Sequence, residues 1–151
     1  MTTRVLLVDD HQLIREGLRR AFERAGDFEV VGEASSVADA EAQLASHEPD
    51  VVIFDVRLPD GSGLDVLSDL LAATPDLPVV MMTGHGSVAD AVEAMRRGAR
   101  DFVQKPLELE EIRLKVERAL GVTREHREVA YHRERQRLVG EVEAGQAAAL
   151  N

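Results

Sequence analysis

The chain has 151 residues, a formal net charge of −10 at pH 7 and no cysteine. This length suits one domain with a short extension, and the lack of cysteine excludes disulfides and thiolate metal sites and is typical of a cytoplasmic protein. The acidic balance argues against direct nucleic-acid binding, because phosphate contacts need clustered Lys and Arg. No run is long and apolar enough to predict a membrane span or a signal peptide.

Predicted strands and helices alternate in the first third of the chain. A strand at 4–8 leads into an amphipathic helix that ends at Gly26, a favoured residue after a helix C-terminus. A second strand at 28–32 precedes a helix for which Ser36 is the expected N-cap. The pattern is typical of βαβ units.

The alternation continues through residue 121. The run VVIF at 51–54 is apolar throughout, which is typical of a strand buried on both faces. The remaining elements are, in order, a turn at 59–63, a helix near 64–73, a strand at 78–82, a helix beginning at Ser87, a strand at 101–104 and a helix from Leu109. Five strands alternating with five helices predict an α/β fold with a parallel sheet covered on both faces.

Polar side chains follow four of the five predicted strands. Asp9 and Asp10 follow the first strand, Asp55 the third, Thr83 the fourth and Lys105 the fifth. In such sheets ligands bind beyond the carboxyl ends of the strands, so we expect these side chains to lie close together. Three converging carboxylates repel one another unless a cation intervenes. All-oxygen ligands suit Mg²⁺, which is therefore the predicted cofactor.

Asp55 is the candidate for covalent chemistry. A carboxylate that attacks a phosphoryl group forms an aspartyl phosphate, whose oxygens then need donors and positive charge. Lys105 and Thr83 could supply an ammonium and a hydroxyl. Each residue alone has a simpler interpretation: Asp9 and Asp10 could cap a helix, Thr83 could belong to a turn, and Asp55 could be a solvated strand end. Their combination favours a phosphate acceptor.

Taken together, these motifs resemble the receiver domain of two-component response regulators. The resemblance covers residues 3 to about 121 and rests on LLVDD at 6–10, FDVRLPDGSG at 54–63, MMTG at 81–84 and DFVQKP at 101–106. It implies a flavodoxin-like, doubly wound, five-stranded parallel sheet of order 2-1-3-4-5. Some segments resemble receivers attached to LuxR-type DNA-binding domains and others resemble those of the NtrC and FixJ kinds, so the subfamily stays open.

The resemblance implies a role for each matching residue. Asp55 is expected to accept a phosphoryl group from a sensor histidine kinase, and Lys105 to contact that group. Asp10, Asp55 and the backbone carbonyl of Arg57 are expected to bind Mg²⁺ directly. Asp9 is expected to contribute through a water molecule.

The resemblance also implies a switch. Thr83 is expected to move to the phosphate, and Phe102 to change rotamer with it. Many members of the family have Tyr at this last position, so Phe102 lacks a hydroxyl that could form a hydrogen bond. Pro106 is expected to follow a cis peptide bond. His11 and His85 lie near the site in the sequence, but we interpret them as surface residues rather than metal ligands.

Two other functions compete with a phosphorylation-controlled switch. A Mg²⁺-dependent phosphatase of the haloacid-dehalogenase kind also forms an aspartyl phosphate. That class needs a DxD pattern after the first strand, where this chain has Asp9, Asp10 and His11. A flavodoxin-like nucleotide binder is disfavoured, because carboxylates repel a phosphate unless a cation intervenes. We therefore expect a signalling module rather than a metabolic enzyme.

The end of the chain differs from the rest. We expect a receiver domain at 1–121 and a helical tail or linker with a frayed end at 122–151. The tail carries balanced charges that suit an exposed helix, and it is too short for a helix-turn-helix domain. The chain is thus either a stand-alone receiver or part of a longer regulator. A homodimer could form through the fourth helix, fifth strand, fifth helix and tail; a solvated linker is the alternative.

Overall fold

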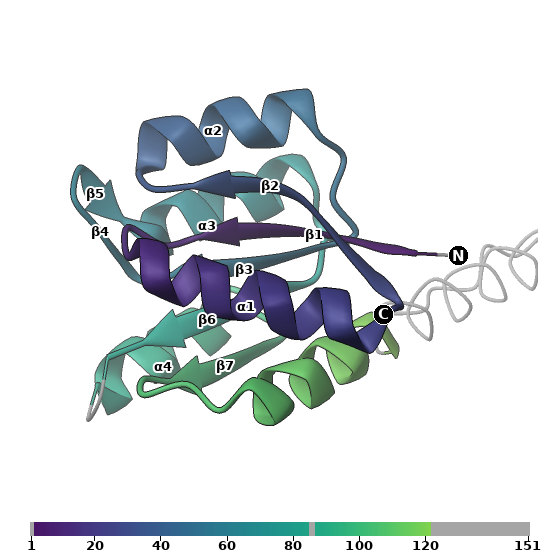
Figure 1. Cartoon of the computed structure of the whole chain (residues 1–151). Coiled ribbons are helices and arrows are strands. Elements are labelled where there is room, and N and C mark those ends of the chain that lie inside the picture. The colour runs from purple at the N-terminus through teal and green to yellow at the C-terminus, as the bar shows by residue number, and fades with distance from the viewer. Residues whose placement is uncertain (1, 85–86, 122–151) are drawn as a thin grey trace, which may run out of the picture. The chain divides into compact units, whose positions relative to one another are not determined.

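The computed structural model describes residues 2–84 and 87–121, in which a parallel sheet forms the centre (Figure 1). Its strands are β1 (Thr3–Val8), β2 (Phe28–Ala34), β3 (Val51–Asp55), β6 (Val79–Thr83) and β7 (Asp101–Gln104). They lie in the order β2-β1-β3-β6-β7, and all four pairings are parallel. Counted within this sheet, the order is 2-1-3-4-5, which confirms the predicted flavodoxin-like fold.

Helices cover both faces of the sheet. They are α1 (Gln12–Ala25), α2 (Val37–Ser46), α3 (Gly63–Ala73), α4 (Val88–Arg96) and a further helix at 109–121. Helix α1 and helix 109–121 pack on one face, and α2, α3 and α4 pack on the other (Figure 1). The sheet is therefore doubly wound.

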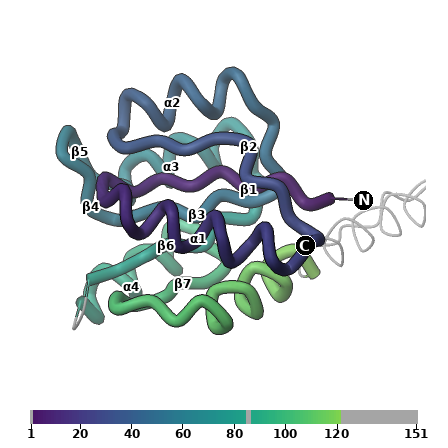
Figure 2. The backbone as a smooth tube through the Cα atoms, in the orientation of Figure 1, coloured from purple at the N-terminus to yellow at the C-terminus, as the bar shows by residue number. Residues whose placement is uncertain are grey.

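The path of the chain reverses direction within the sheet (Figure 2). From β1 the chain moves outward to the edge strand β2, and it then returns past β1 to β3, β6 and β7. The carboxyl ends of β1 and β3 flank this reversal. In open α/β sheets a ligand crevice forms at such a switch point, because the flanking loops diverge to opposite faces. The topology thus directs attention to the residues after β1 and β3.

Two layers of apolar side chains hold the helices against the sheet. Along β3, Ile53 packs in the layer with Phe22 of α1 and Val116 of helix 109–121. The next residue, Phe54, packs in the opposite layer with Leu67 of α3. Successive strand residues point to opposite faces, so a central strand covered on both sides needs apolar residues at every position. This explains the uninterrupted apolar run in β3.

Several predicted helix ends are confirmed. Gly26 follows α1 in the left-handed region, with φ of 80°, where glycine carries no steric penalty. Ser36 caps α2, and its hydroxyl accepts a hydrogen bond from the amide of Asp39 at 3.1 Å. Ser87 precedes α4 as predicted, although its side chain makes no cap hydrogen bond.

Two predicted boundaries are corrected. Strand β2 extends two residues beyond the predicted 28–32, because a register shift after Val5 lets β1 continue to pair as far as Val8 with Ala34. The predicted turn at 59–63 contains part of a short antiparallel hairpin of β4 (Arg57–Leu58) and β5 (Gly61–Ser62). The predicted tail at 122–151 and His85 lie outside the described residues.

Candidate metal and phosphoryl site

Acidic and basic side chains meet at the carboxyl ends of β1, β3 and β7. Asp9 and Asp10 follow β1, Asp55 is the last residue of β3, and Lys105 follows β7. The ammonium of Lys105 lies 3.0 Å from Oδ2 of Asp9 and 3.0 Å from Oδ2 of Asp55. The structure thus brings together four residues that the sequence placed at three strand ends.

The two carboxylates that contact Lys105 are removed from water. Asp9 is fully buried and Asp55 is 4% exposed, whereas the Asp10 side chain is 36% exposed. Oδ2 of Asp9 has an ion-pair contact with Lys105 but no well-directed hydrogen bond from the described residues. Buried charges are costly without partners, so one ammonium between two carboxylates leaves a net negative charge that favours a cation.

The buried groups differ in their proton affinity. Burial raises the pKa of Asp55, and the nearby charge of Asp9 adds to this effect against the opposing hydrogen bond from Lys105. Burial also raises the pKa of Asp9, but the hydrogen bond from the His11 amide and the ion pair with Lys105 outweigh it and hold the pKa below its ordinary value. Burial lowers the pKa of Lys105, but the effect of its two carboxylate partners is larger, and the pKa lies above its ordinary value. Asp55 is therefore the carboxylate that the fold leaves least stabilised.

The segment after β3 fixes the position of Asp55. The amide of Arg57 donates to Oδ1 of Asp55 at 3.2 Å. The amide of Gly63 donates to the carbonyl of Val56 at 2.7 Å, which brings the start of α3 against the end of β3. A Cβ atom at Gly63 would lie 2.1 Å from the carbonyl oxygen of Asp55, so only glycine fits there. The sequence analysis predicted that Gly63 lies in a turn, but it did not predict that this residue helps to position Asp55.

Asp60 is a second residue whose role the sequence analysis missed. Its carboxylate accepts hydrogen bonds from the amides of Val37 at 2.7 Å and Ala38 at 3.1 Å. It therefore joins the loop after Asp55 to the N-terminus of α2, where a negative charge is favourable. The DG pair at 60–61 signals a turn, but nothing local in the sequence identifies a partner helix 22 residues earlier.

The loop after β1 holds its own network. Oδ1 of Asp9 accepts a hydrogen bond from the amide of His11 at 2.8 Å and lies 3.0 Å from Nδ1 of the same residue. That Nδ1 also lies 3.1 Å from Oδ1 of Asp10. Arg15 of α1 donates to the carbonyl of Asp9 and pairs with Glu33 at 3.2 Å. His11 is a surface residue by exposure, at 62%, but its ring contacts both acidic residues.

The donor set fits a divalent cation. Asp9, Asp10, His11 and Asp55 each offer one ligand atom, and these atoms lie within 4.8 Å of one another. Three of the four are carboxylate oxygens, the ligands that hard cations such as Mg²⁺ prefer. Arg57 contacts Asp55 through its amide, so the role of its carbonyl as a metal ligand stays a prediction.

Thr83 and Phe102 occupy neighbouring strands beside the acidic site. Thr83 ends β6 and is fully buried, and its hydroxyl donates to the carbonyl of Val103 at 3.4 Å. Phe102 in β7 is half-buried, and the ammonium of Lys115 lies 5.1 Å from the centre of its ring. The peptide bond between Lys105 and Pro106 is cis.

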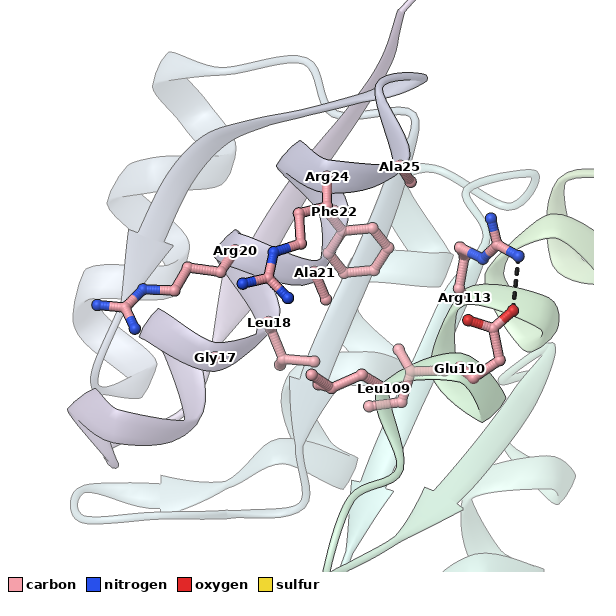
Figure 3. Close-up of a pocket in the computed structure, with 11 residues that line it drawn as sticks. Gly17, Leu18, Arg20, Ala21, Phe22, Arg24, Ala25, Leu109, Glu110 and Arg113 are labelled. Atoms are coloured by element: carbon pink, nitrogen blue, oxygen red, sulfur yellow. Dashed lines mark hydrogen bonds and ion pairs between the residues drawn. The ribbon is translucent and has the colours of Figure 1, made fainter.

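A separate cavity of about 520 Å³ lies between α1 and helix 109–121 (Figure 3). Leu18, Phe22 and Ile112 give it an apolar lining, and Arg113 at its side pairs with Glu110 at 2.6 Å. No residue of the acidic site lines it. The predicted chemistry therefore belongs to the strand ends and not to this cavity.

Within 2–84 and 87–121, no helix is long and apolar enough to cross a membrane.

Comparison with known proteins identifies relatives along most of the chain. The family model of the response regulator receiver domain matches residues 5–117. The sequence is 41% identical over 104 residues to the DNA-binding transcriptional activator DevR/DosR of Mycobacterium tuberculosis. That match covers 69% of this chain and 48% of the activator, so this chain spans about half the length of that relative.

Solved structures give the same result. The chain is similar to NtrX from Brucella abortus, with a TM-score of 0.81 and 36% identity over 93% of this chain and 31% of NtrX. It is also similar to the beryllofluoride-activated NtrC4 receiver domain dimer, with a TM-score of 0.72 and 33% identity over 80% of this chain and 98% of that one. The phosphatase alternative gains no support. The chain therefore belongs to the receiver domain family of two-component response regulators.

Proposed function

We propose that this receiver is a phosphorylation-controlled switch in which Asp55 accepts the phosphoryl group. The observation that supports this most strongly is the environment of its carboxylate. Asp55 is 4% exposed at the end of the central strand and lies 3.0 Å from the ammonium of Lys105. A buried carboxylate with a raised pKa and an adjacent cation can attack an electrophile and then share the charge of the product.

A sensor histidine kinase is the proposed donor, in keeping with the partners of this family. An oxygen of Asp55 attacks phosphorus, and the phosphorus–nitrogen bond of the donor phosphohistidine breaks. The electron pair stays on the imidazole nitrogen, which takes up a proton from water. Lys105 then neutralises a phosphoryl oxygen, and the amide of Arg57 remains within hydrogen-bond distance of the Asp55 side chain.

The acidic residues form the proposed Mg²⁺ site. Receiver domains bind Mg²⁺ at an acidic pocket, and here Asp9, Asp10 and Asp55 supply the carboxylates. We assign direct ligation to Asp10, Asp55 and the carbonyl of Arg57, and a water-mediated contact to Asp9. When bound, Mg²⁺ neutralises charge on the phosphoryl oxygens.

The proposed output is a change in a protein-interaction surface. Thr83 would exchange its long hydrogen bond to Val103 for one to the phosphoryl group, and Phe102 would change rotamer in response. On the adjacent α4 the apolar side chains of Val88 and Val92 are 65% and 49% exposed. Together with β7 and helix 109–121, α4 forms the surface that we propose for dimerisation. The related NtrC4 receiver domain forms a dimer.

Asp55 can be tested by intact-protein mass spectrometry after incubation with Mg²⁺ and acetyl phosphate. The native chain should gain the mass of one phosphoryl group, and Asp55→Asn should gain none. Asp65→Asn is a matched control, because that side chain is 76% exposed on α3 and should not affect labelling. Equal labelling of Asp55→Asn and the native chain would disprove the assignment.

We propose that residues 1–121 form the receiver domain and that residues 122–151 serve either as a linker or as a tail that contributes to the dimer. Sedimentation of the full chain and of 1–121, each with and without phosphodonor, separates these roles. A tail that contributes to the dimer predicts weaker association of 1–121. Unchanged association would leave the linker role, and monomers in every sample would refute the dimer.

A further inference from the structure

We propose that His11 supplies a nitrogen ligand to the metal centre and raises its affinity for Co²⁺ and Ni²⁺ relative to Mg²⁺. The inference rests on the proposed function, because it concerns the metal centre of the same site. It goes beyond the carboxylate and carbonyl ligands by adding a residue that determines which metals the centre selects.

The spacing of the ligand atoms supports this role. Nδ1 of His11 lies 3.0 Å from Oδ1 of Asp9 and 3.1 Å from Oδ1 of Asp10. Adjacent ligands on an octahedral ion with bonds of about 2.1 Å are separated by about 3.0 Å. Asp10 is a proposed direct ligand, and Nδ1 therefore already lies at the distance from its oxygen that neighbouring ligands of one ion adopt.

The backbone keeps His11 at the site. Its amide donates to Oδ1 of Asp9 at 2.8 Å, and its backbone at the start of α1 is extended, with φ of −89° and ψ of 107°. The carboxylate it faces belongs to a fully buried residue whose Oδ2 receives no well-directed hydrogen bond from the described residues. The ring itself is 62% exposed, so an ion can approach it from solvent.

Ligand chemistry determines how the metals should differ. Mg²⁺ takes oxygen ligands and gains little from an imidazole, whereas Co²⁺ and Ni²⁺ bind nitrogen ligands well. Loss of residues that only support a ligand typically weakens metal binding about 10–100-fold. Removal of a direct nitrogen ligand should therefore weaken Ni²⁺ binding by at least about tenfold and change Mg²⁺ binding by less than about twofold.

The test compares the untagged full chain with His11→Asn by isothermal titration with Ni²⁺ and separately with Mg²⁺. Asn keeps a polar group near the carboxylates but lacks the imidazole nitrogen. His47→Ala is the matched control, because His47 follows α2 and belongs to no metal-ligand cluster in the described residues. The proposal predicts that only His11→Asn loses Ni²⁺ affinity selectively. Equal losses for both metals, or no loss, would overturn it.

Coordination can also be observed directly. Proton NMR of the Co²⁺-loaded chain should contain strongly shifted imidazole ring resonances that disappear in His11→Asn and persist in His47→Ala. Their presence in His11→Asn, or their absence from the native chain, would overturn the proposal. Acetyl phosphate labelling of Asp55 is scored separately. Selective Ni²⁺ binding without labelling would therefore refute the proposed function alone, and labelling without metal selectivity would refute this inference alone.

Discussion

Replacing Lys105 by Met tests whether its ammonium holds two buried carboxylates together before a metal binds. Nζ lies 3.0 Å from Oδ2 of both Asp9 and Asp55. At an effective dielectric constant of about 20, each contact corresponds to about 5.5 kcal/mol of Coulomb attraction. Desolvation of the three charges offsets much of this. Met keeps most of the side-chain volume, so the variant removes the charge and leaves two like charges facing each other.

The expected loss has an upper bound. Protonation of Asp55 would end the repulsion between the two carboxylates. For a carboxyl with the ordinary pKa of 3.8, protonation at pH 7 costs about 4.4 kcal/mol, so the loss of stability cannot exceed about this value. Removal of one partner from a buried pair typically costs about 3–5 kcal/mol, and Lys105 is 20% exposed, which lowers this figure. We expect the free energy of unfolding to fall by about 2–4 kcal/mol.

Urea unfolding followed by circular dichroism, with and without Mg²⁺, measures this loss. A ligand at about 100 times its dissociation constant adds about 2.7 kcal/mol to the native chain. At the same Mg²⁺ concentration Lys105→Met should gain more stability than the native chain, because no ammonium then repels the ion. Lys115→Met is the control, since Lys115 is the other lysine and its ammonium pairs with Glu111 at 3.2 Å and donates to the Phe102 carbonyl at 2.6 Å. This variant should lose about 1–2 kcal/mol of stability and respond to Mg²⁺ as the native chain does.

Two results would refute this reasoning. One is a Lys105→Met variant that unfolds at the native urea concentration without Mg²⁺. The other is a Mg²⁺-dependent gain no larger than that of the native chain. Either result would mean that Lys105 does not compensate the charges of Asp9 and Asp55.

Three further predictions concern the same region. Gly63→Ala should lower the free energy of unfolding by about 3 kcal/mol, because its Cβ would lie 2.1 Å from the carbonyl oxygen of Asp55; native stability in urea would contradict this. Leu67→Ala should lose about 2–5 kcal/mol from the buried layer beside β3, and a loss below 1 kcal/mol would argue against tight packing there. Asp55→Asn should be more stable than the native chain at pH 7 without metal. A raised folded-state pKa gives stability that is present at low pH and is lost as pH rises through it, so the advantage of Asn should vanish on acidification. If the difference in stability between the two proteins did not change with pH, the predicted direction of the pH dependence would be wrong.

The strand pattern was sufficient to predict a parallel sheet and the meeting of distant residues, whereas the strand order followed from the family resemblance. Asp9, Asp55 and Lys105 follow three parallel strands, and parallel strands that carry βαβ connections end at the same edge. The separation of 50 residues between Asp55 and Lys105 therefore becomes a contact of 3.0 Å. Gly26 and Ser36 were predictable because helix ends depend on local backbone conformation and nearby hydrogen bonds.

Contacts that depend on tertiary geometry were not predictable in this way. Asp60 reaches the N-terminus of α2 only because the β4–β5 hairpin approaches it. Gly63 is required because α3 begins against the backbone of Asp55, which no local pattern encodes. His11 was interpreted as a surface residue, and its exposure agrees with this, but the direction of its ring toward Asp9 and Asp10 depends on how α1 starts.

Chemical mapping of the phosphorylated residue tests the central claim most directly. After incubation with Mg²⁺ and acetyl phosphate, borohydride reduces an aspartyl phosphate to homoserine, and peptide mass spectrometry locates the changed residue. We predict homoserine at Asp55 alone, dependent on Mg²⁺. Homoserine at Asp9 or Asp10, or an unmodified Asp55 in a chain that carries phosphate, would contradict the account.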